Sequence, residues 1–150
     1  MNSLHILHLN INGLRGKKAL LELYVTETAP DVICLNETKL GALAPSQPLC
    51  YNIACNRERT ANNGGGVVIY TRTNLLHEDI SRDKGDLVAT VLNLSGDKLT
   101  IIAYYCPPEK DTLDTDDLNY YFSNYRNTVI TGDLNSKHVY FGSSKTDNKI

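Results

Sequence analysis

A carboxylate and a carboxamide two residues apart follow an apolar run late in the sequence. Val129–Thr131 leads into Gly132, and Asp133 and Asn135 come directly after it. Ligand sites in α/β proteins lie outside such strand ends. An acid and an amide there could share one phosphate group and one water molecule. Taken alone, these residues also fit a simpler interpretation, a strand closed by an Asx turn, because Gly, Asp and Asn all form turns.

Three further polar groups stand at the ends of apolar, strand-like runs: Asn10, with Asn12 close by, Glu37 and Tyr105. Each has a plain interpretation by itself: a turn residue, a solvated acid, or a ring packed against the prolines that follow it. If the strands lie side by side, all of these groups and the Asp133/Asn135 pair crowd one rim. Their joint occurrence at four strand ends favours a common site.

Such a rim would suit a divalent cation and a phosphodiester. Glu37 would hold Mg²⁺, a hard cation that takes oxygen ligands and keeps several waters. Asp133 would orient or deprotonate the attacking water. The Asn10 and Asn135 amides and the Tyr105 hydroxyl would hold phosphate oxygens and stabilise the charge of the pentacoordinate transition state. The metal would polarise the phosphoryl oxygen and stabilise the leaving group.

The first third of the chain predicts a βαβ unit. Leu4–Leu9 is a short apolar run that ends in turn residues, and Asp31–Leu35 is a second one. Between them, Arg15–Ala29 predicts a helix closed by Pro30. Its expected apolar face consists of Leu20, Leu21, Tyr24, Val25 and Thr28. A strand, a helix and a strand in this order predict a parallel pair.

The remainder predicts mostly strands, with one helix at 113–125 whose apolar face would hold Leu118, Tyr121, Phe122 and Tyr125. The expected strands are Tyr51–Cys55, Gly66–Tyr70, Leu87–Leu94, Leu99–Tyr105 and the run at Val129, with turns at Asn62–Gly65 and Ser95–Lys98. This order predicts an α/β sandwich of mixed sheets with helices outside.

Two features invite a catalytic interpretation that we set aside. Gly64–Gly66 could cradle a phosphate, but the Lys-Ser/Thr and the following helix of a P-loop are absent, so a hairpin turn is favoured. His138 could act as a general base. Because it lies three residues after Asn135, we expect His138 to be a structural loop residue that braces the turn.

Bulk properties indicate one globular domain over residues 1–150, with 41% hydrophobic and 21% charged residues. The net charge of -2 counts mildly against a pure nucleic-acid-binding module, and less against a nuclease with acidic metal ligands. Four cysteines without zinc spacing are expected to be reduced thiols in an intracellular protein. The chain has neither a signal-peptide pattern nor a run of membrane-spanning length, so we expect a soluble protein.

Several motifs together resemble the endonuclease/exonuclease/phosphatase superfamily. The resemblance covers essentially the whole chain and is greatest to the apurinic-like endonuclease domain of Jockey-type non-LTR retrotransposons. The motifs are Leu9-Asn10-Ile11-Asn12-Gly13-Leu14, Asn36-Glu37-Thr38-Lys39, Gly64-Gly65-Gly66-Val67-Val68-Ile69, Tyr105-Cys106-Pro107-Pro108, Gly132-Asp133-Leu134-Asn135-Ser136-Lys137-His138 and Phe141-Gly142-Ser143.

The resemblance implies a four-layer α/β sandwich with two mixed β-sheets flanked by helices. It implies Mg²⁺-dependent hydrolysis, with Mn²⁺ as a possible substitute, that nicks double-stranded DNA and leaves a 3′-hydroxyl to prime reverse transcription. A reverse transcriptase domain in the full-length polyprotein and a nuclear location would follow; a membrane partner would not.

The same resemblance implies roles for individual residues. Glu37, assisted by Asn10, matches the metal ligand, and Asp133 matches the residue that activates water. Asn10, Asn135 and Tyr105 match the polar groups around metal and phosphate. Asn12, Asn135 and Tyr105 are the expected substrate contacts, although Asn12 stands where repair endonucleases often have aspartate.

One family signature is missing. The family carries a late Ser-Asp-His whose histidine contacts the scissile phosphate, and nothing after Asn135 supplies it. We therefore expect a C-terminally truncated domain with late strands missing, unpaired strand edges and exposed apolar surface. Two alternatives to an active endonuclease follow: a catalytically inactive remnant, and a small-molecule or lipid phosphodiesterase of the same superfamily.

Overall fold

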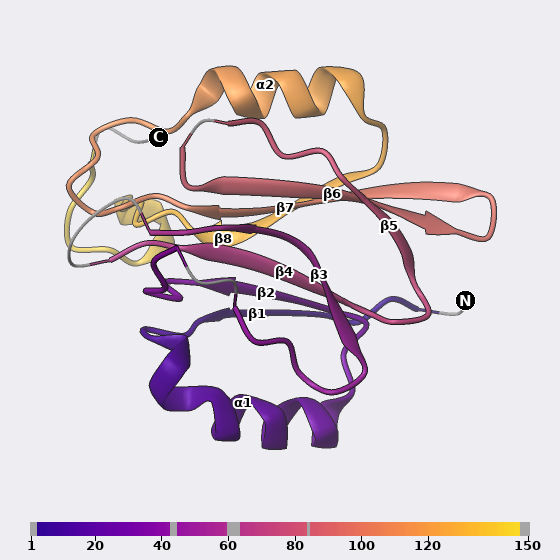
Figure 1. Ribbon diagram of the computed structural model, residues 1–150. Helices are drawn as coiled ribbons and strands as arrows, with labels where there is room; N and C mark the ends of the chain where they lie inside the picture. The colour runs from indigo at the N-terminus through magenta and orange to yellow at the C-terminus, as the bar shows by residue number, and fades with distance from the viewer. Residues whose placement is uncertain (1–2, 43–44, 60–63, 84, 148–150) are drawn as a thin grey trace.

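The computed structural model describes residues 3–42, 45–59, 64–83 and 85–147. Two four-stranded sheets pack face to face, and one helix covers the outer face of each (Figure 1). The layers run helix α1 (Leu14–Thr28), sheet, sheet, helix α2 (Thr115–Asn124). This confirms the predicted four-layer α/β sandwich with mixed sheets.

The first sheet contains the βαβ unit. Its strand order is β1-β2-β4-β3, and β1 and β2 pair in parallel as predicted, with α1 as the crossover between them. The other two pairings are antiparallel. The four strands are β1 (Ile6–Asn10), β2 (Val32–Asn36), β3 (Tyr51–Arg57) and β4 (Val67–Arg72).

The second sheet has the order β5-β6-β7-β8. The predicted hairpin joins β6 (Leu87–Leu94) to β7 (Asp97–Tyr105), and β8 (Thr128–Asp133) runs parallel to β7 after the α2 crossover. Strand β5 (Leu76–Asp79) was not predicted. Three of its four residues are exposed, because it forms one edge of the sheet and buries no continuous apolar face.

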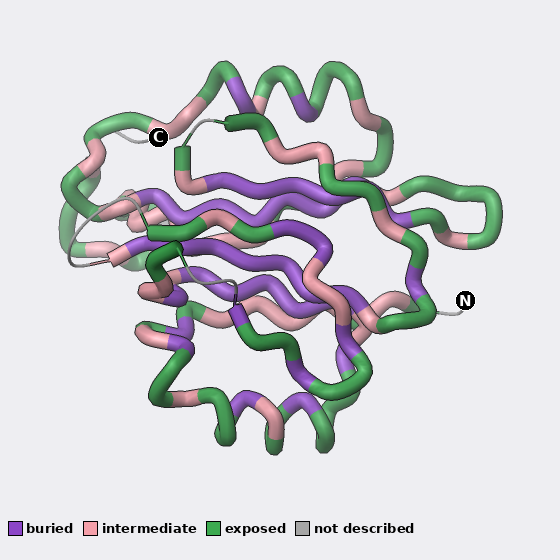
Figure 2. Tube along the Cα trace, viewed as in Figure 1, coloured by how far each residue is buried: buried purple, intermediate pink, exposed green. Residues whose placement is uncertain are grey.

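The main core fills the space between the sheets, where the buried stretches of the strands run side by side (Figure 2). All five residues of β2 are buried, since this strand has neighbours on both sides and packing on both faces. Two smaller clusters lie under the helices, one around Leu21 and Val25 of α1 and one around Tyr121 of α2.

The predicted helix faces are partly wrong. On α1 the buried side chains are Leu14, Leu21 and Val25, whereas Leu20 and Tyr24 are exposed. Each helix packs on its sheet along a narrow stripe, so only one residue of each adjacent apolar pair is buried and the other faces outward. The same geometry leaves Phe122 of α2 exposed while Tyr121 is fully buried.

The sandwich has strand edges on both sides, with β3 and β5 at one and β1 and β8 at the other. Among the described residues, β1 and β8 each have one pairing partner, and these two edge strands contact each other across the sheets. Val129 and Ile130 on β8 are exposed. The predicted unpaired edges and exposed apolar surface are therefore present. Such edges are templates for pairing with another strand.

All four cysteines are free, as expected for reduced thiols, and Cys34, Cys55 and Cys106 are buried. Burial raises the pKa of the Cys34 thiol to about 12, so this side chain packs as a small apolar group. Within the described part of the chain, no helix is long and apolar enough to cross a membrane.

Gly132 offers a test of the β7–β8 pairing that positions Asp133. A Cβ at this position would lie 1.9 Å from the Tyr104 carbonyl oxygen, which belongs to the paired backbone and cannot swing away. We expect Gly132→Ala to lower the free energy of unfolding by about 3 kcal/mol. Urea unfolding measures this.

Gly16 supplies the matched control, because it lies in α1 with open space around the position of a Cβ. Gly16→Ala should raise the free energy of unfolding by up to about 1 kcal/mol, the helix-propensity difference. Equal stability of Gly132→Ala and wild type would contradict the close approach of β7 and β8.

Candidate functional site

The four predicted strand ends meet at one rim. The β7–β8 register sets Tyr105 opposite Asp133, and β1 and β2 end side by side at Asn10 and Asn36, one residue before Glu37. Two side-chain hydrogen bonds link the sheets there. Asn10 Nδ2 donates to Asp133 Oδ2 at 3.0 Å, and the Tyr105 hydroxyl donates to Glu37 Oε1 at 2.7 Å.

Asp133 is oriented through both carboxylate oxygens. Asn10 binds Oδ2, and the backbone N–H of Asn135 donates to Oδ1 at 3.1 Å, which closes an Asx turn. The Asn135 side chain itself donates from Nδ2 to the carbonyl of Cys106 at 3.0 Å. Both interpretations of the Gly-Asp-x-Asn sequence therefore hold: the turn exists, and it presents a half-buried carboxylate at the rim.

Tyr105 reaches the rim as a hydrogen-bond donor. Burial, reinforced by the hydrogen bond to Glu37, raises the pKa of Tyr105 above its ordinary value of 10.0. The phenol therefore stays protonated at neutral pH and can donate to an anion. The residue is 4% exposed, so its ring belongs to the core between the sheets while its hydroxyl faces the carboxylate.

Asn12 forms hydrogen bonds with Lys39 and with Asn10. Its side-chain oxygen accepts a hydrogen bond from Lys39 Nζ, and its backbone N–H donates to Asn10 Oδ1 at 3.2 Å. Lys39 Nζ also lies 3.6 Å from Glu37 Oε2. Asn12, the predicted substrate contact, therefore lies at the same rim. Lys39 places a positive charge beside the Glu37 carboxylate.

Left-handed backbone is concentrated at this rim. Asn12, Glu37, Lys39 and Asn135 have φ of 45°, 52°, 54° and 47°. Non-glycine residues in this region cost of order 1 kcal/mol or more each, and they persist where surrounding contacts over-determine them. Here the hydrogen bonds of Asn12 with Lys39, of Glu37 with Tyr105 and of Asn135 with Cys106 supply those contacts.

The glycine run forms one wall of the site. Thr38 N and Lys39 N donate to the carbonyls of Gly66 and Gly65 at 3.1 and 3.0 Å. Gly66 has φ of 88°, and a Cβ there would meet Thr38 Oγ1 at 2.3 Å, so only glycine fits this approach. The expected turn at Asn62–Gly65 lies partly outside the described residues. The run itself braces the segment that carries Glu37.

Two rim residues were given no role by the sequence. Lys39 is part of the Asn36-Glu37-Thr38-Lys39 motif, and its positive charge two residues after Glu37 is the signal that could have identified it. His8 lies two residues before Asn10 and thus on the same face of β1. Its Nε2 is buried without a hydrogen-bond partner among the described residues. Burial lowers the pKa of His8, and the nearby Asp133 carboxylate opposes this effect.

His138 braces the loop after β8, as predicted: its Nδ1 accepts a hydrogen bond from the backbone N–H of Tyr140 at 3.2 Å.

The donor chemistry of the rim fits a hard cation. Mg²⁺ needs only one or two protein carboxylates, because it keeps several waters and shares substrate phosphates. Glu37 and Asp133 supply carboxylates, and Asn10 supplies an amide oxygen. Within the described ranges, no three His, Cys, Asp or Glu side chains come together as a metal cage. A sparse oxygen set of this kind suits Mg²⁺ or Mn²⁺ rather than structural zinc.

The fold consists of two mixed sheets packed between two helices, with acids and amides at one rim, and a family model identifies its class. The family model described as "Endonuclease/Exonuclease/phosphatase family" matches residues 7–148. The chain belongs to this family. No curated protein sequence matches the chain.

Solved structures share the fold at low sequence identity. The endonuclease domain of TRAS1, a telomere-specific non-LTR retrotransposon, superposes with a TM-score of 0.74 at 13% identity over 97% of this chain. Humanized D. rerio TDP2 gives 0.66 at 18% identity over 93%. The 3′ phosphatase NExo from Neisseria, bound to product DNA hairpin, gives 0.65 at 18% identity over 89%.

The chain spans only part of these proteins: 65% of the TRAS1 domain, 69% of TDP2 and 58% of NExo.

The raised pKa of Tyr105 has a consequence for stability. Above about pH 10 the unfolded chain loses phenolic protons that the folded chain keeps, so the folded state binds more protons. The free energy of unfolding must then fall as the pH rises. We expect the curve for Tyr105→Phe to fall less steeply than that of wild type, as measured by urea unfolding at stepped pH. Parallel curves would show that Tyr105 titrates as an exposed phenol.

Proposed function

We propose that the chain carries the catalytic rim of a Mg²⁺-dependent phosphodiesterase that nicks double-stranded DNA. The supporting observation is the pairing of Asn10 with Asp133 and of Tyr105 with Glu37 across the two sheets. These pairs bring a general base, a metal-binding acid, an amide and a phenolic donor to one place. Hydrolysis of a phosphodiester needs this combination of groups.

Asp133 acts as the group that orients and deprotonates the attacking water, because Asn10 and Asn135 fix both of its oxygens. The Tyr105 hydroxyl, which donates to Glu37 in this structure, would donate to a non-bridging phosphate oxygen of a bound substrate. Asn10 and Asn12 hold the phosphate from the β1 side, with Lys39 supplying positive charge between Asn12 and Glu37.

Glu37, with Asn10, would hold Mg²⁺ or Mn²⁺. When bound, the cation neutralises charge on the phosphoryl oxygens and on the leaving oxygen. The contacts of Glu37 with Tyr105 and Lys39 keep its carboxylate at the rim before any cation arrives.

DNA as the substrate is supported by the relatives. NExo was solved with a product DNA hairpin, and TRAS1 is a retrotransposon endonuclease. By analogy, the chain would cut one strand to leave a 3′-hydroxyl that primes a reverse transcriptase domain of the same polyprotein, in the nucleus. This analogy rests on the shared fold and on the motifs at the rim.

A second candidate is a catalytically inactive remnant of such a domain. The observation that favours it is the edge formed by β1 and β8, where Val129 and Ile130 are exposed. The rim pairs are present, and residues 1–150 do not contain the Ser-Asp-His that the resemblance implies for the phosphate contact. One donor of this kind contributes about 3–4 kcal/mol to transition-state stabilisation.

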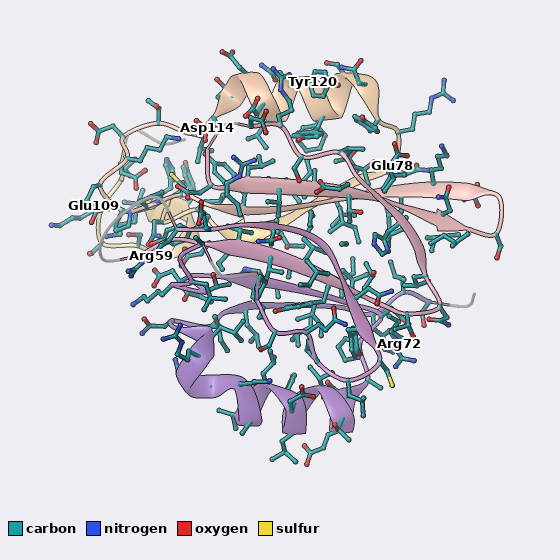
Figure 3. The ribbon with its side chains drawn as sticks, in the orientation of Figure 1. Arg59, Arg72, Glu78, Glu109, Asp114 and Tyr120 are labelled. Carbon is teal, nitrogen blue, oxygen red and sulfur yellow. The ribbon has the colours of Figure 1, made fainter. Side chains whose placement is uncertain are left out.

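Supercoiled plasmid nicking with Mg²⁺ separates the two candidates. An active endonuclease should show nicking that is abolished by a chelator and slowed about 100-fold or more by Asp133→Asn and by Glu37→Gln. The matched control is Glu78→Gln, an exposed acid on β5. It lies far from Arg59 (Figure 3), whose backbone N–H donates to the Leu40 carbonyl beside the segment that carries Glu37.

Nicking that persists at the wild-type rate in both rim variants would overturn the proposed roles. A folded chain with no nicking at all would support the inactive remnant. Hydrolysis of sphingomyelin in place of DNA would identify a lipid phosphodiesterase instead.

A further inference from the structure

The loop that follows the catalytic strand presents an aromatic pair to solvent. Tyr140 is 90% exposed, the most exposed of the large apolar side chains in the described ranges. Its ring stacks on His138 with centroids 5.3 Å apart and planes only 5° from parallel. A single exposed apolar residue needs no explanation in general. This one differs because its partner ring and its loop hold it in place.

Backbone contacts make the loop rigid. Lys137 N donates to Asp147 Oδ2 and Asp147 N donates to the Lys137 carbonyl, both at 2.9 Å, so the loop is closed at its base. The short helix η1 (Val139–Phe141) lies within it, and Gly142 N donates to the Val139 carbonyl at 3.1 Å. The His138 Nδ1 contact with Tyr140 N locks the turn that carries both rings.

The loop lies at the catalytic end of the molecule. It leaves β8 directly after Asp133 and Asn135, and η1 sits at the end of the sandwich where β7 and β8 terminate (Figure 1). Two exposed cations, Lys137 and Lys145, belong to the same loop, while its one acid, Asp147, is occupied by the closing hydrogen bond. The outward charge of the loop is therefore positive.

A flat, exposed ring in a loop that also carries two exposed lysines is suited to a nucleobase and the phosphates of its strand. Base–aromatic stacking tolerates any sequence, because every base has a π-face, and lysines supply the backbone contact. We propose that the Tyr140–His138 pair stacks on an unstacked base next to the phosphodiester cut at the rim. This proposal rests on the DNA substrate proposed above and adds a contact surface outside the catalytic residues.

The test uses the wild-type chain without divalent cation, so that the DNA stays intact. The probe is a duplex with a short single-stranded gap that contains 2-aminopurine, whose fluorescence is quenched when it stacks on an aromatic ring. We expect quenching with wild type and with Tyr140→Phe, which keeps the ring. Tyr140→Ala should lose the quenching and raise the dissociation constant about tenfold.

Val139→Ala is the matched control, since Val139 is its exposed neighbour in η1 and lacks a ring. It should bind and quench as wild type does. Circular dichroism checks that each variant folds. Equal binding and quenching by Tyr140→Ala would overturn the proposal. The absence of DNA binding by wild type would also overturn it and would point to a protein as the partner of the aromatic pair.

Plasmid nicking, measured separately, distinguishes this proposal from the proposed function. If Tyr140→Ala nicks DNA like wild type at the same positions, the stacking proposal fails while the nuclease stands. If wild type does not nick but quenches the probe through Tyr140, the stacking proposal holds and the hydrolytic function fails.

Discussion

A buried amide joins the two halves of this sandwich. Asn36, at the end of β2 and fully buried, donates from Nδ2 to the carbonyl of Tyr104 on β7 at 2.8 Å. Core packing is non-directional and would tolerate one sheet sliding over the other. A hydrogen bond inside the core does not, because moving it would leave a polar group unpaired at a cost of about 1–3 kcal/mol. The relative position of Glu37 and Tyr105, each one residue further along, depends on this contact.

The site therefore works as two cross-sheet pairs on a fixed frame. One sheet contributes Asn10 and Glu37, and the other contributes Asp133 and Tyr105. Neither sheet carries a functional set alone. In the proposed reaction each acid would start from a hydrogen-bonded orientation, so little reorganisation would be needed, which is how electrostatic preorganisation lowers a barrier.

The sequence was most informative where strands end. Apolar runs broken by Asn10, Glu37 and Asp133 predicted both the strands and their meeting, because a parallel β-α-β crossover brings strand ends to the same edge. Side-chain direction on helices was harder to predict. Adjacent apolar pairs such as Leu20-Leu21 do not reveal which member faces the sheet. Strand β5 escaped notice because an exposed edge strand lacks an apolar alternation.

The contacts of Lys39 and His8 could not be predicted either, for another physical reason. The surroundings of His8 include Asp133 of the other sheet, so they depend on how far one sheet is displaced over the other, and no pattern within one strand records that displacement. Lys39 contacts Asn12 because the loops after β1 and β2 of the same sheet meet at the rim, and the conformations of these loops follow no apolar period.

The Asn10–Asp133 hydrogen bond joins residues 123 positions apart, and the Tyr105–Glu37 bond joins residues 68 apart. Closing such long loops is entropically costly, and contacts of this range form late in folding. The rim cannot assemble in a nascent or partly folded chain, since β8 must first dock beside β7. If the rim cuts DNA as proposed, cleavage could begin only after the chain has completed its fold.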